Sequence, residues 1–363
     1  MSNKNFDPSG VAHKNGNYFG VPFSPEESEI VILPMPWDVT TSYRDGTSKG
    51  PKAILDASYQ LDLYSPFLDH AWNTKIGSLP SPKKIALLNQ RLRKEAKAII
   101  AFLESGKDLA KNKPMQKRLE KLNRDSLVAH KFVEDEVKRW RNKGKKVIIL
   151  GGDHSSSYGA IKATAEDLGS LSILHFDAHA DLREAYEGFE HSHASIMFNA
   201  LEITEVSQLT QVGLRDVCEE ELKIIRSNRK VKSFFDMDLK TELASGKSWD
   251  QICTKIIENL GTNVYISFDI DGLDPKLCPH TGTPVPGGLE MHEALLLMDK
   301  VVESGRKIVG ADLLEVAPSG LKNEEWDANV GARVLYQLCQ LTKKSMSSDF
   351  VLTHSKQRHS MAL

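Results

Sequence analysis

Three features that mark special classes of protein are missing from this sequence. Its four cysteines include no C-x-x-C pair, so we expect reduced thiols rather than a disulfide framework. No apolar run approaches the roughly 20 residues that span a bilayer, and the N-terminal segment lacks the apolar core of a secretory signal. The formal net charge is only −2, which gives no basic footprint for nucleic acid. We therefore expect a cytoplasmic protein whose partners are neither nucleic acids nor membranes.

Most of the chain is expected to form one domain. A length of 363 residues suits one large α/β domain or two ordinary ones, and no internal repeat or low-complexity linker marks a boundary. Residues 1–27 are rich in Asn, Gly, Ser and Pro and predict a loop arm. We expect a single domain over residues 28–343 and a loose polar tail over residues 344–363.

Short apolar segments alternate with amphipathic segments along this domain. Strands are predicted at residues 29–33, 147–150, 171–176, 211–214, 264–268 and 308–314. Helices are predicted at residues 53–65, 131–141, 157–168 and 326–343. This alternation predicts an α/β fold in which helices cover both faces of a mostly parallel sheet.

The segment from Asn73 to Arg124 is strongly basic, with 14 Lys or Arg residues against 4 Asp or Glu residues. Its apolar residues recur at helical spacing, which favours a pair of amphipathic helices with solvated basic faces. A polyanion-binding patch is the alternative, but no Gly-rich phosphate loop or interleaved aromatic residues support it.

Five short motifs carry most of the histidines and carboxylates that suggest chemistry: GGDHS at 151–155, DAHAD at 177–181, SHAS at 192–195, SFDIDGLDP at 267–275 and EVAP at 315–318. All except SHAS follow directly on a predicted strand. Because the carboxyl ends of parallel strands share one edge of a sheet, the fold should bring these distant residues together.

Six of these side chains would repel one another at a single edge unless cations neutralised them: His154, Asp177, His179, Asp181, Asp269 and Asp271. An oxygen-rich set with two imidazoles favours Mn²⁺, with another divalent ion such as Ni²⁺ as the alternative. Six ligands exceed what one small ion needs when water must also bind, so two ions about 3.5–4 Å apart fit the count. Asp153 lies in the same motif as His154, but a helix cap accounts for it equally well.

Taken together, these motifs resemble those of the ureohydrolase family, which includes arginases, agmatinases and formimidoylglutamases. The likeness runs from about Pro36 to Leu338 with an apparent insertion near residues 101–128, and three segments favour the agmatinase branch: 40–66, 181–197 and 281–289. The resemblance implies a three-layer α/β/α fold, two Mn²⁺ ions at the sheet edge, a small guanidino substrate, and a homo-oligomer of three or six subunits. We expect the insertion to form an added layer away from the metal edge, or a subunit contact.

The resemblance also implies roles for particular residues. One ion would be held by His154, Asp177, Asp181 and Asp269. The other would be held by Asp177, His179, Asp269 and Asp271. Asp181 would also accept a hydrogen bond from the water that the ions share. Glu315 matches the family's guanidinium anchor, and His193 matches its proton-transfer histidine. Thr283 is expected to line the pocket, and loop position alone suggests His191 and Trp326.

The expected reaction is hydrolysis of a guanidino C–N bond with release of urea. Agmatine is the preferred substrate, because the loop 182–192 offers no basic residue for a substrate carboxylate beyond Arg183. Guanidine, arginine and other guanidino acids are alternatives, and formiminoglutamate would give formamide instead. Residues 194–197 and the loop after Glu315 depart from the usual agmatinase pattern, and we expect both to border the part of the pocket that contacts the substrate's tail. A catalytically silent binding protein is the alternative from another class.

Overall fold

A computed structural model of the protein describes residues 6–322 and 324–347. Within these residues, eight strands form one parallel sheet in the order β2-β1-β3-β8-β7-β4-β5-β6. The strands are β1 (Ile30–Pro34), β2 (Ile76–Ser78), β3 (Lys146–Leu150), β4 (Leu171–Phe176), β5 (Val206–Leu214), β6 (Val231–Phe235), β7 (Asn263–Asp269) and β8 (Lys307–Leu314).

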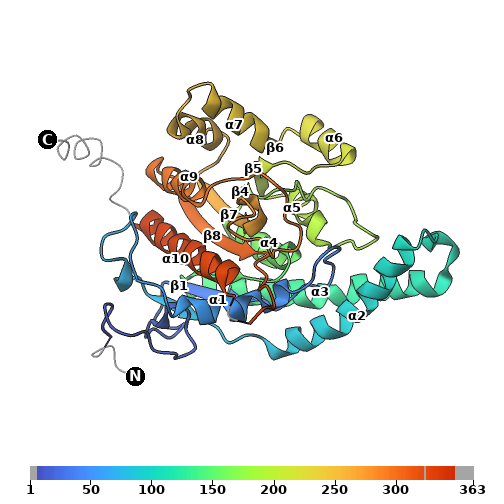
Figure 1. Ribbon diagram of the computed structural model, residues 1–363, viewed down its shortest axis with the longest axis horizontal. Coiled ribbons are helices and arrows are strands. Elements are labelled where there is room, and N and C mark those ends of the chain that lie inside the picture. Colours follow the sequence, from blue (N-terminus) through green and yellow to red (C-terminus); the bar gives the residue numbers. More distant parts are fainter. Residues whose placement is uncertain (1–5, 323, 348–363) are drawn as a thin grey trace.

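The helices lie in two layers, one on each face of the sheet (Figure 1). They are α1 (Gly50–Ser58), α2 (Lys83–Glu104), α3 (Lys113–Arg141), α4 (Tyr158–Leu168), α5 (Ile196–Leu201), α6 (Glu219–Ser227), α7 (Asp236–Ala244), α8 (Trp249–Ile257), α9 (Met291–Glu303) and α10 (Trp326–Met346). Helices α1, α8, α9 and α10 pack on one face, and α2, α3, α4 and α5 pack on the other. The predicted three-layer α/β/α fold is confirmed.

Strand β1 shows how the sequence produces these layers. Its residues alternate between the two cores, because successive side chains of a strand point to opposite faces. Ile30 and Ile32 join the core under α1 and α10, whereas Val31 and Leu33 join the core under α2 and α3. All four side chains are buried, so the strand is apolar at every position, as a sheet covered on both faces requires.

Two helices end at residues other than those predicted. Helix α1 ends at Ser58 rather than near residue 65, and the Ser58 hydroxyl accepts a hydrogen bond from the amide of Phe19. That contact fixes the N-terminal arm, whose Phe19 ring is buried. Helix α10 continues to Met346, past the predicted end at residue 343, because Lys344 forms a buried ion pair with Asp299. The rest of the predicted polar tail, from residue 348, lies outside the described residues.

Helices α2 and α3 form the predicted pair of amphipathic basic helices, and α3 also takes in the helix predicted separately at residues 131–141. The far end of this α2–α3 hairpin extends beyond the sheet (Figure 1). Apolar residues such as Leu92 and Val133 face the core, and charged residues on the outer faces pair with one another, as Arg118 does with Glu95. The solvated basic faces of two amphipathic helices therefore account for the charge.

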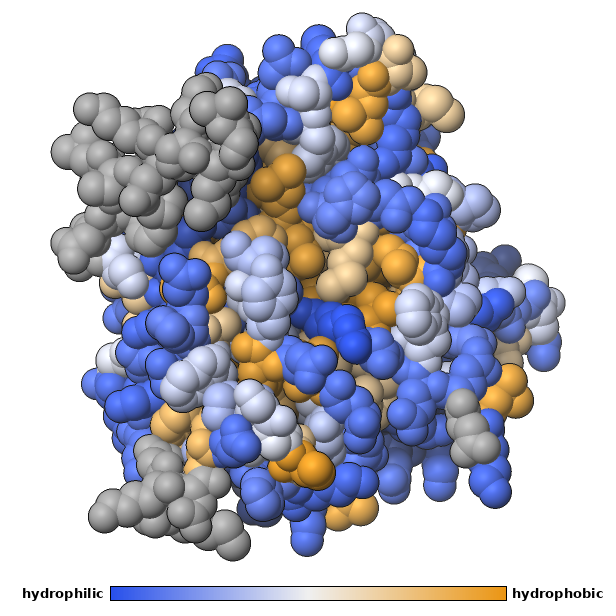
Figure 2. All heavy atoms as spheres, turned by 60° about the vertical axis from the view of Figure 1, so that its left-hand side comes forward, coloured by the Kyte–Doolittle hydropathy of each residue, from blue (hydrophilic) through white to orange (hydrophobic). Residues whose placement is uncertain are grey.

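None of the helices in the described part of the chain has the length and apolar character that a membrane span needs. Figure 2 shows one face of the molecule, where hydrophilic side chains predominate and hydrophobic ones gather around a central hollow.

Candidate metal centre

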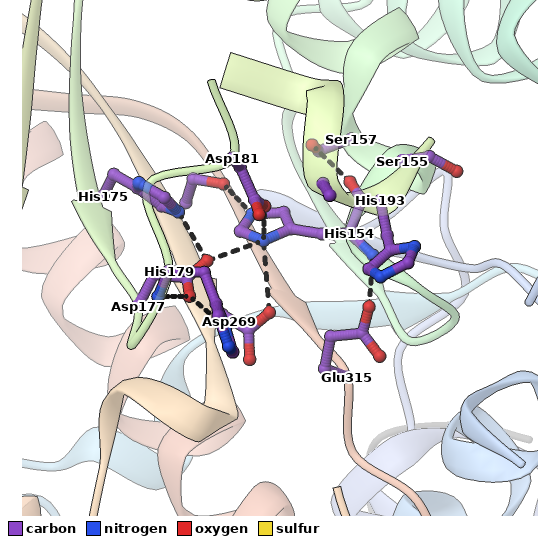
Figure 3. A network of polar contacts seen from close by, with 12 residues as sticks. His154, Ser155, Ser157, His175, Asp177, His179, Asp181, His193, Asp269 and Glu315 are labelled. Atoms are coloured by element: carbon purple, nitrogen blue, oxygen red, sulfur yellow. Dashed lines mark hydrogen bonds and ion pairs between the residues drawn. The ribbon is translucent and has the colours of Figure 1, made fainter. Parts of the chain in front are cut away.

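Four neighbouring strands in the middle of the sheet, β3, β8, β7 and β4, carry the predicted motifs at their carboxyl ends. His154 follows β3, Asp177 follows β4, Asp269 ends β7, and Glu315 follows β8. Their side chains therefore meet at one edge, as the strand pattern predicted (Figure 3).

Two glycines turn the chain from β3 into the site. Gly151 and Gly152 have φ angles of 87° and 72°, and a Cβ on Gly152 would lie 2.6 Å from the carbonyl oxygen of Trp37. Only glycine fits such a close backbone approach. Asp153 then accepts a hydrogen bond from the amide of Ser155, so it caps the 3-10 helix His154–Ser157. The interpretation of Asp153 as a cap is confirmed.

The first group of candidate ligands surrounds the His154 ring. Three carboxylate oxygens lie near its Nδ1 atom, at 3.1 Å (Asp177 Oδ2), 3.2 Å (Asp181 Oδ2) and 3.2 Å (Asp269 Oδ2). All four side chains are almost fully buried. Buried carboxylates this close to one another need a compensating positive charge.

The opposite nitrogen of His154 fixes the direction of its lone pair. The Ser267 hydroxyl donates to Asp312 at 3.0 Å, so it accepts from His154 Nε2, which lies 2.9 Å away. The Nδ1 atom then carries the lone pair, and it is a buried atom with no hydrogen-bond partner among the described residues. An imidazole lone pair aimed at three carboxylates is the arrangement that a metal ion completes.

The second group shares Asp177 with the first. The Nδ1 atom of His179 lies 3.3 Å from Asp177 Oδ1 and 3.2 Å from Asp271 Oδ2. Thr283 donates a hydrogen bond to the same Asp271 oxygen at 3.3 Å. Two ligand groups joined by one carboxylate can hold two neighbouring ions, as the ligand count suggested.

The DAHAD segment reaches both groups because it does not stay extended. In an extended chain its alternate residues would face one side. Instead, the chain bends after Asp177, so Asp181 turns to the first group and His179 to the second. Asp181 has a φ angle of 54°, in the left-handed region that non-glycine residues rarely adopt. Such strain persists where the surrounding structure enforces it, and it is common at functional sites.

The pKa values of the first group of candidate ligands are strongly shifted, because carboxylates are crowded together in a buried place. Burial lowers the pKa of His154, but the attraction of Asp177, Asp181 and Asp269 outweighs it and leaves that pKa well above its ordinary value. Burial and the charge of Asp177 raise the pKa of Asp181 to about 7. Burial and two neighbouring aspartates raise the pKa of Asp269 well above its ordinary value. The raised pKa values mean that protons reduce the repulsion among these carboxylates. Divalent cations bound between them would reduce the same repulsion, so the donor set fits metal ions.

His175 belongs to this site, although the sequence reasoning treated it only as part of a strand. Its Nε2 atom lies 2.8 Å from Asp177 Oδ2, and it is buried. The Gln211 amide donates to both Ala180 O and His175 Nδ1, so Nε2 must carry the hydrogen and donate to Asp177. With both ring nitrogens engaged, His175 orients a ligand rather than serving as one. A polar residue inside an otherwise apolar strand was the available signal.

Glu315 is held in a fixed direction at the end of β8. Its φ angle is 61°, and its Oε1 atom accepts a hydrogen bond from the His154 amide at 2.9 Å. The other oxygen, Oε2, is buried and has no hydrogen-bond partner within the described residues. Burial and the nearby Asp153 raise the pKa of this carboxyl group well above its ordinary value. A free, buried carboxylate oxygen is an acceptor that awaits a cationic donor.

A cavity of about 170 Å³ connects these groups. It is lined by His154, His179, Asp181, Asp269, Glu315, His193 and Thr283, and also by Ser42, Arg183, Tyr186, Ala194, Asp216 and Glu221, which the sequence reasoning did not select. Burial, together with His179 and His154, lowers the pKa of His193 to about 3, below the ordinary value near 6.5. The imidazole of His193 is therefore neutral and able to accept a proton.

Two suggested pocket residues lie elsewhere. His191 packs against the rings of His130 and Tyr158 and is not among the residues that line the cavity. Trp326 begins α10, is 49% exposed, and donates its ring N–H to Lys276 O. Loop position alone could not separate these residues from those that face the cavity.

The segment 101–128 differs from the first of its two expectations, an added layer away from the metal edge, while the other, a subunit contact, stays a prediction. Within the segment 101–128, Asn123 donates a hydrogen bond to Gly188 O in the loop 182–192. Arg183 and Tyr186 of that same loop line the cavity. The segment therefore reaches the metal edge indirectly.

Comparison with known proteins agrees with this geometry. A sequence model of the arginase family matches residues 28–340. The chain belongs to the arginase family. Members of this family are hydrolases, and this arginase-family chain is therefore a hydrolase, of the ureohydrolase type.

Two relatives of this arginase-family chain span nearly all of the match. The N(1)-aminopropylagmatine ureohydrolase of Thermus thermophilus is 34% identical over 303 residues, which cover 84% of this chain and 87% of that protein. The agmatinase of Bacillus subtilis is 30% identical over 313 residues, which cover 86% and 91%.

Solved structures establish the fold. The agmatine ureohydrolase of Thermoplasma volcanium aligns with a TM-score of 0.67 at 24% identity, covering 90% of this chain and 94% of that one. The arginase from Medicago truncatula aligns with a TM-score of 0.63 at 23% identity and covers 87% of each chain. Members with different substrates thus share this architecture.

Proposed function

We propose that the protein is a binuclear manganese ureohydrolase that cleaves the guanidino group of an amine-tailed substrate, with agmatine as the first candidate. The observation that carries this proposal is the shared cavity. Two ligand groups joined by Asp177 open into the same space as the unpartnered oxygen of Glu315. A site for two cations and a site for a guanidinium therefore lie side by side.

The metal centre uses the six predicted residues, with Asp177 common to both groups: His154, Asp177, His179, Asp181, Asp269 and Asp271. Two divalent ions bound there would lower the pKa of a shared water, so that hydroxide is available near neutral pH. The mixed set of carboxylate oxygens and two imidazoles supports Mn²⁺. Asp181, in its strained conformation, directs a carboxylate oxygen toward the first group.

Glu315 orients the substrate. Its Oε1 atom is occupied by the His154 amide, so Oε2 is left to accept from the planar guanidinium. Charged hydrogen bonds of this kind are shorter and stronger than neutral ones. The same carboxylate would thus bind both the guanidinium and the His154 amide. It would therefore fix the guanidinium carbon relative to His154, a ligand of the first group.

His193 is the proposed proton carrier. Its ring lines the cavity, and its backbone amide donates to the Thr40 hydroxyl at 3.1 Å, which fixes its position. Its imidazole is neutral, so a ring nitrogen has a lone pair free for a proton that it can pass to the departing amine, and this role requires its pKa to rise from about 3 toward neutrality in the loaded site. Among the described residues, no hydrogen bond or ion pair joins the His193 side chain to any of the six candidate ligands.

The cavity wall supports a tail with an amino group rather than a carboxylate. Arg183 is the basic residue of the loop 182–192, but its guanidinium lies over the Tyr186 ring at 4.6 Å and 4.0 Å from Glu221. Asp216, which is exposed, adds a carboxylate to the lining. A cationic tail suits this wall better than an anionic one.

N(1)-aminopropylagmatine is the second candidate substrate. The relative from Thermus thermophilus that carries this name is 34% identical to the chain, against 30% for the agmatinase from Bacillus subtilis. The two substrates share the guanidino head and differ in the length and charge of the tail, so the proposed chemistry is common to both.

A urea-release screen of the Mn²⁺-loaded protein tests the proposal. We expect urea from agmatine or N(1)-aminopropylagmatine, and little from arginine, guanidine or guanidino acids. No urea from any guanidino compound, with both ions bound, would support a silent binding protein instead. A cytoplasmic location and a homo-oligomer of three or six subunits stay predictions.

A further inference from the structure

The α2–α3 hairpin contacts the loop 182–192, hereafter the pocket loop. Asn123 of α3 makes two hydrogen bonds to its backbone. The side-chain amide donates to Gly188 O at 3.0 Å, and the side-chain oxygen accepts from the Glu190 amide at 3.4 Å. Asn123 is 9% exposed, so both bonds are shielded from water. One side chain thus satisfies a donor and an acceptor of the loop.

The loop backbone at this contact has an unusual conformation. Glu187 and Gly188 have φ angles of 55° and 82°, in the left-handed region. A Cβ on Gly188 would lie 2.5 Å from Leu119 Cδ2, so the helix and the loop approach each other closely. Two successive left-handed residues, one of them glutamate, are maintained only when neighbouring groups hold them.

A cluster of rings forms the second contact. The His191 ring of the pocket loop lies 4.8 Å from the His130 ring of α3 and 5.3 Å from the Tyr158 ring, measured between centroids. His130 is 4% exposed. The hairpin therefore holds the pocket loop at both Gly188 and His191.

The opposite side of the pocket loop faces the cavity. Tyr186 lines the cavity, pairs with Phe189 through a hydrogen bond from the Phe189 amide at 2.9 Å, and carries Arg183 over its ring. Phe189 is fully buried. A change in how Asn123 holds Gly188 is thus transmitted over two residues to the wall that meets the substrate's tail.

The metal ligands follow central strands and are held apart from Asn123. His193 is fixed by Thr40, and the 3-10 helix His193–Ser195 is capped by Ser192, which accepts from the Ala194 amide. Helix α2 reaches this region through a separate contact, because Arg93 donates to Val39 O and Thr41 O on either side of Thr40. The contact made by Asn123 should therefore affect where the tail lies, and leave the reacting head in place.

We infer that the α2–α3 hairpin is a clamp that shapes the tail side of the cavity, with Asn123 as its positioning residue. This inference rests on the proposed function, because it assigns the Tyr186 wall to the tail of a guanidino substrate.

Two variants test the clamp in the Mn²⁺-loaded protein. Asn123→Asp keeps the shape of the side chain but removes the donor to Gly188 O, and Asn123→Ala removes both bonds. Ser126→Ala is the matched control, since Ser126 lies one turn further on the same helix, is buried, and its hydroxyl has no partner among the described residues. Leu119→Ala, at a half-buried position, weakens the same contact if the Asn123 variants fold poorly.

We expect both Asn123 variants to raise KM for agmatine about tenfold while kcat stays within about twofold, because a lost hydrogen bond costs roughly one factor of ten. Hydrogen exchange of the amides of residues 184–190 should accelerate, and the control should change neither quantity. A purely structural role would lower the melting temperature and leave KM unchanged. That result, or a fall in kcat at constant KM, would overturn the inference.

The exchange experiment needs no substrate. If the wild-type chain released no urea, the proposed function would fail, whereas unaltered exchange in both Asn123 variants would refute the clamp itself.

Discussion

Replacing Glu315 with glutamine tests the proposed guanidinium anchor most directly. The two side chains have nearly the same shape, so Glu315→Gln should keep an oxygen in place to accept from the His154 amide. What changes is the second terminal atom. Oε2 is buried and unpartnered, and in the variant an amide nitrogen takes its place. The negative charge that would meet a guanidinium is lost.

The expected loss follows from the strength of that contact. A hydrogen bond to a charged group contributes about 1.5–3 kcal/mol, which corresponds to roughly 10- to 150-fold in kcat/KM. Because Glu315 is 4% exposed, water cannot replace the lost charge, so we expect a value toward the upper end of this range. An amide nitrogen facing the guanidinium would add repulsion between two donors and increase the loss further.

Steady-state urea release and elemental analysis together give the test. Glu315→Gln should retain two ions per chain, since neither oxygen of Glu315 belongs to a ligand group. Glu315→Asp serves as the control that keeps the negative charge but shortens the side chain, and its rate should stay below that of the wild type. Wild-type kcat/KM in Glu315→Gln, with both ions bound, would refute the assignment. Loss of an ion would show that Glu315 acts through the His154 backbone instead.

Three further changes probe other parts of the molecule. Asp269→Asn should abolish binding of both ions, because its carboxylate lies in the first group and the family resemblance makes it a ligand of both ions. His154→Asn should remove only one ion. Elemental analysis that finds one ion or none in the active wild type would contradict the proposed metal centre. His193→Asn should keep both ions and lower kcat by about 100-fold, the typical share of a positioned proton carrier; loss of an ion instead would make His193 a ligand. Burial, with the charge of His191, lowers the pKa of His130 to about 3, so its neutral form stabilises the fold above the unfolded-state pKa near 6.5, and this stabilisation is lost as the pH falls toward 3. Between pH 7 and pH 5, chaotrope unfolding of the metal-free wild type should therefore lose about 2 kcal/mol more than that of His130→Phe, and equal losses would show that His130 is not buried neutral.

The sequence was most informative where candidate ligands and catalytic residues directly follow a strand. Strands β3, β4, β7 and β8 were predicted from apolar runs, and the rule that parallel strands end at one edge was enough to bring His154 and Asp269 together. The strained turn at Asp181 could not be predicted in the same way, because a left-handed aspartate has no local sequence signal.

Two other features depend on contacts between distant segments. His175 supports Asp177 only because Gln211, from the neighbouring strand, fixes its tautomer. Asn123 reaches Gly188 across 65 residues of sequence, and helical periodicity says nothing about which loop a helix will meet. A single sequence read by local patterns therefore yields the ligands, but not the residues that hold them.

The hydrogen bond between the Glu315 carboxylate and the His154 backbone amide has a consequence for how such a protein can change in evolution. The carboxylate that would bind the guanidino head accepts a hydrogen bond from the backbone of a candidate metal ligand, and both lie in the packed centre of the sheet. Mutations that displace this backbone would disturb head recognition and metal binding together. The tail wall is built from surface loops and one protruding hairpin, which accept insertions and substitutions readily. New substrates should therefore arise by remodelling the hairpin and the pocket loop, while the four central strands keep the same reaction.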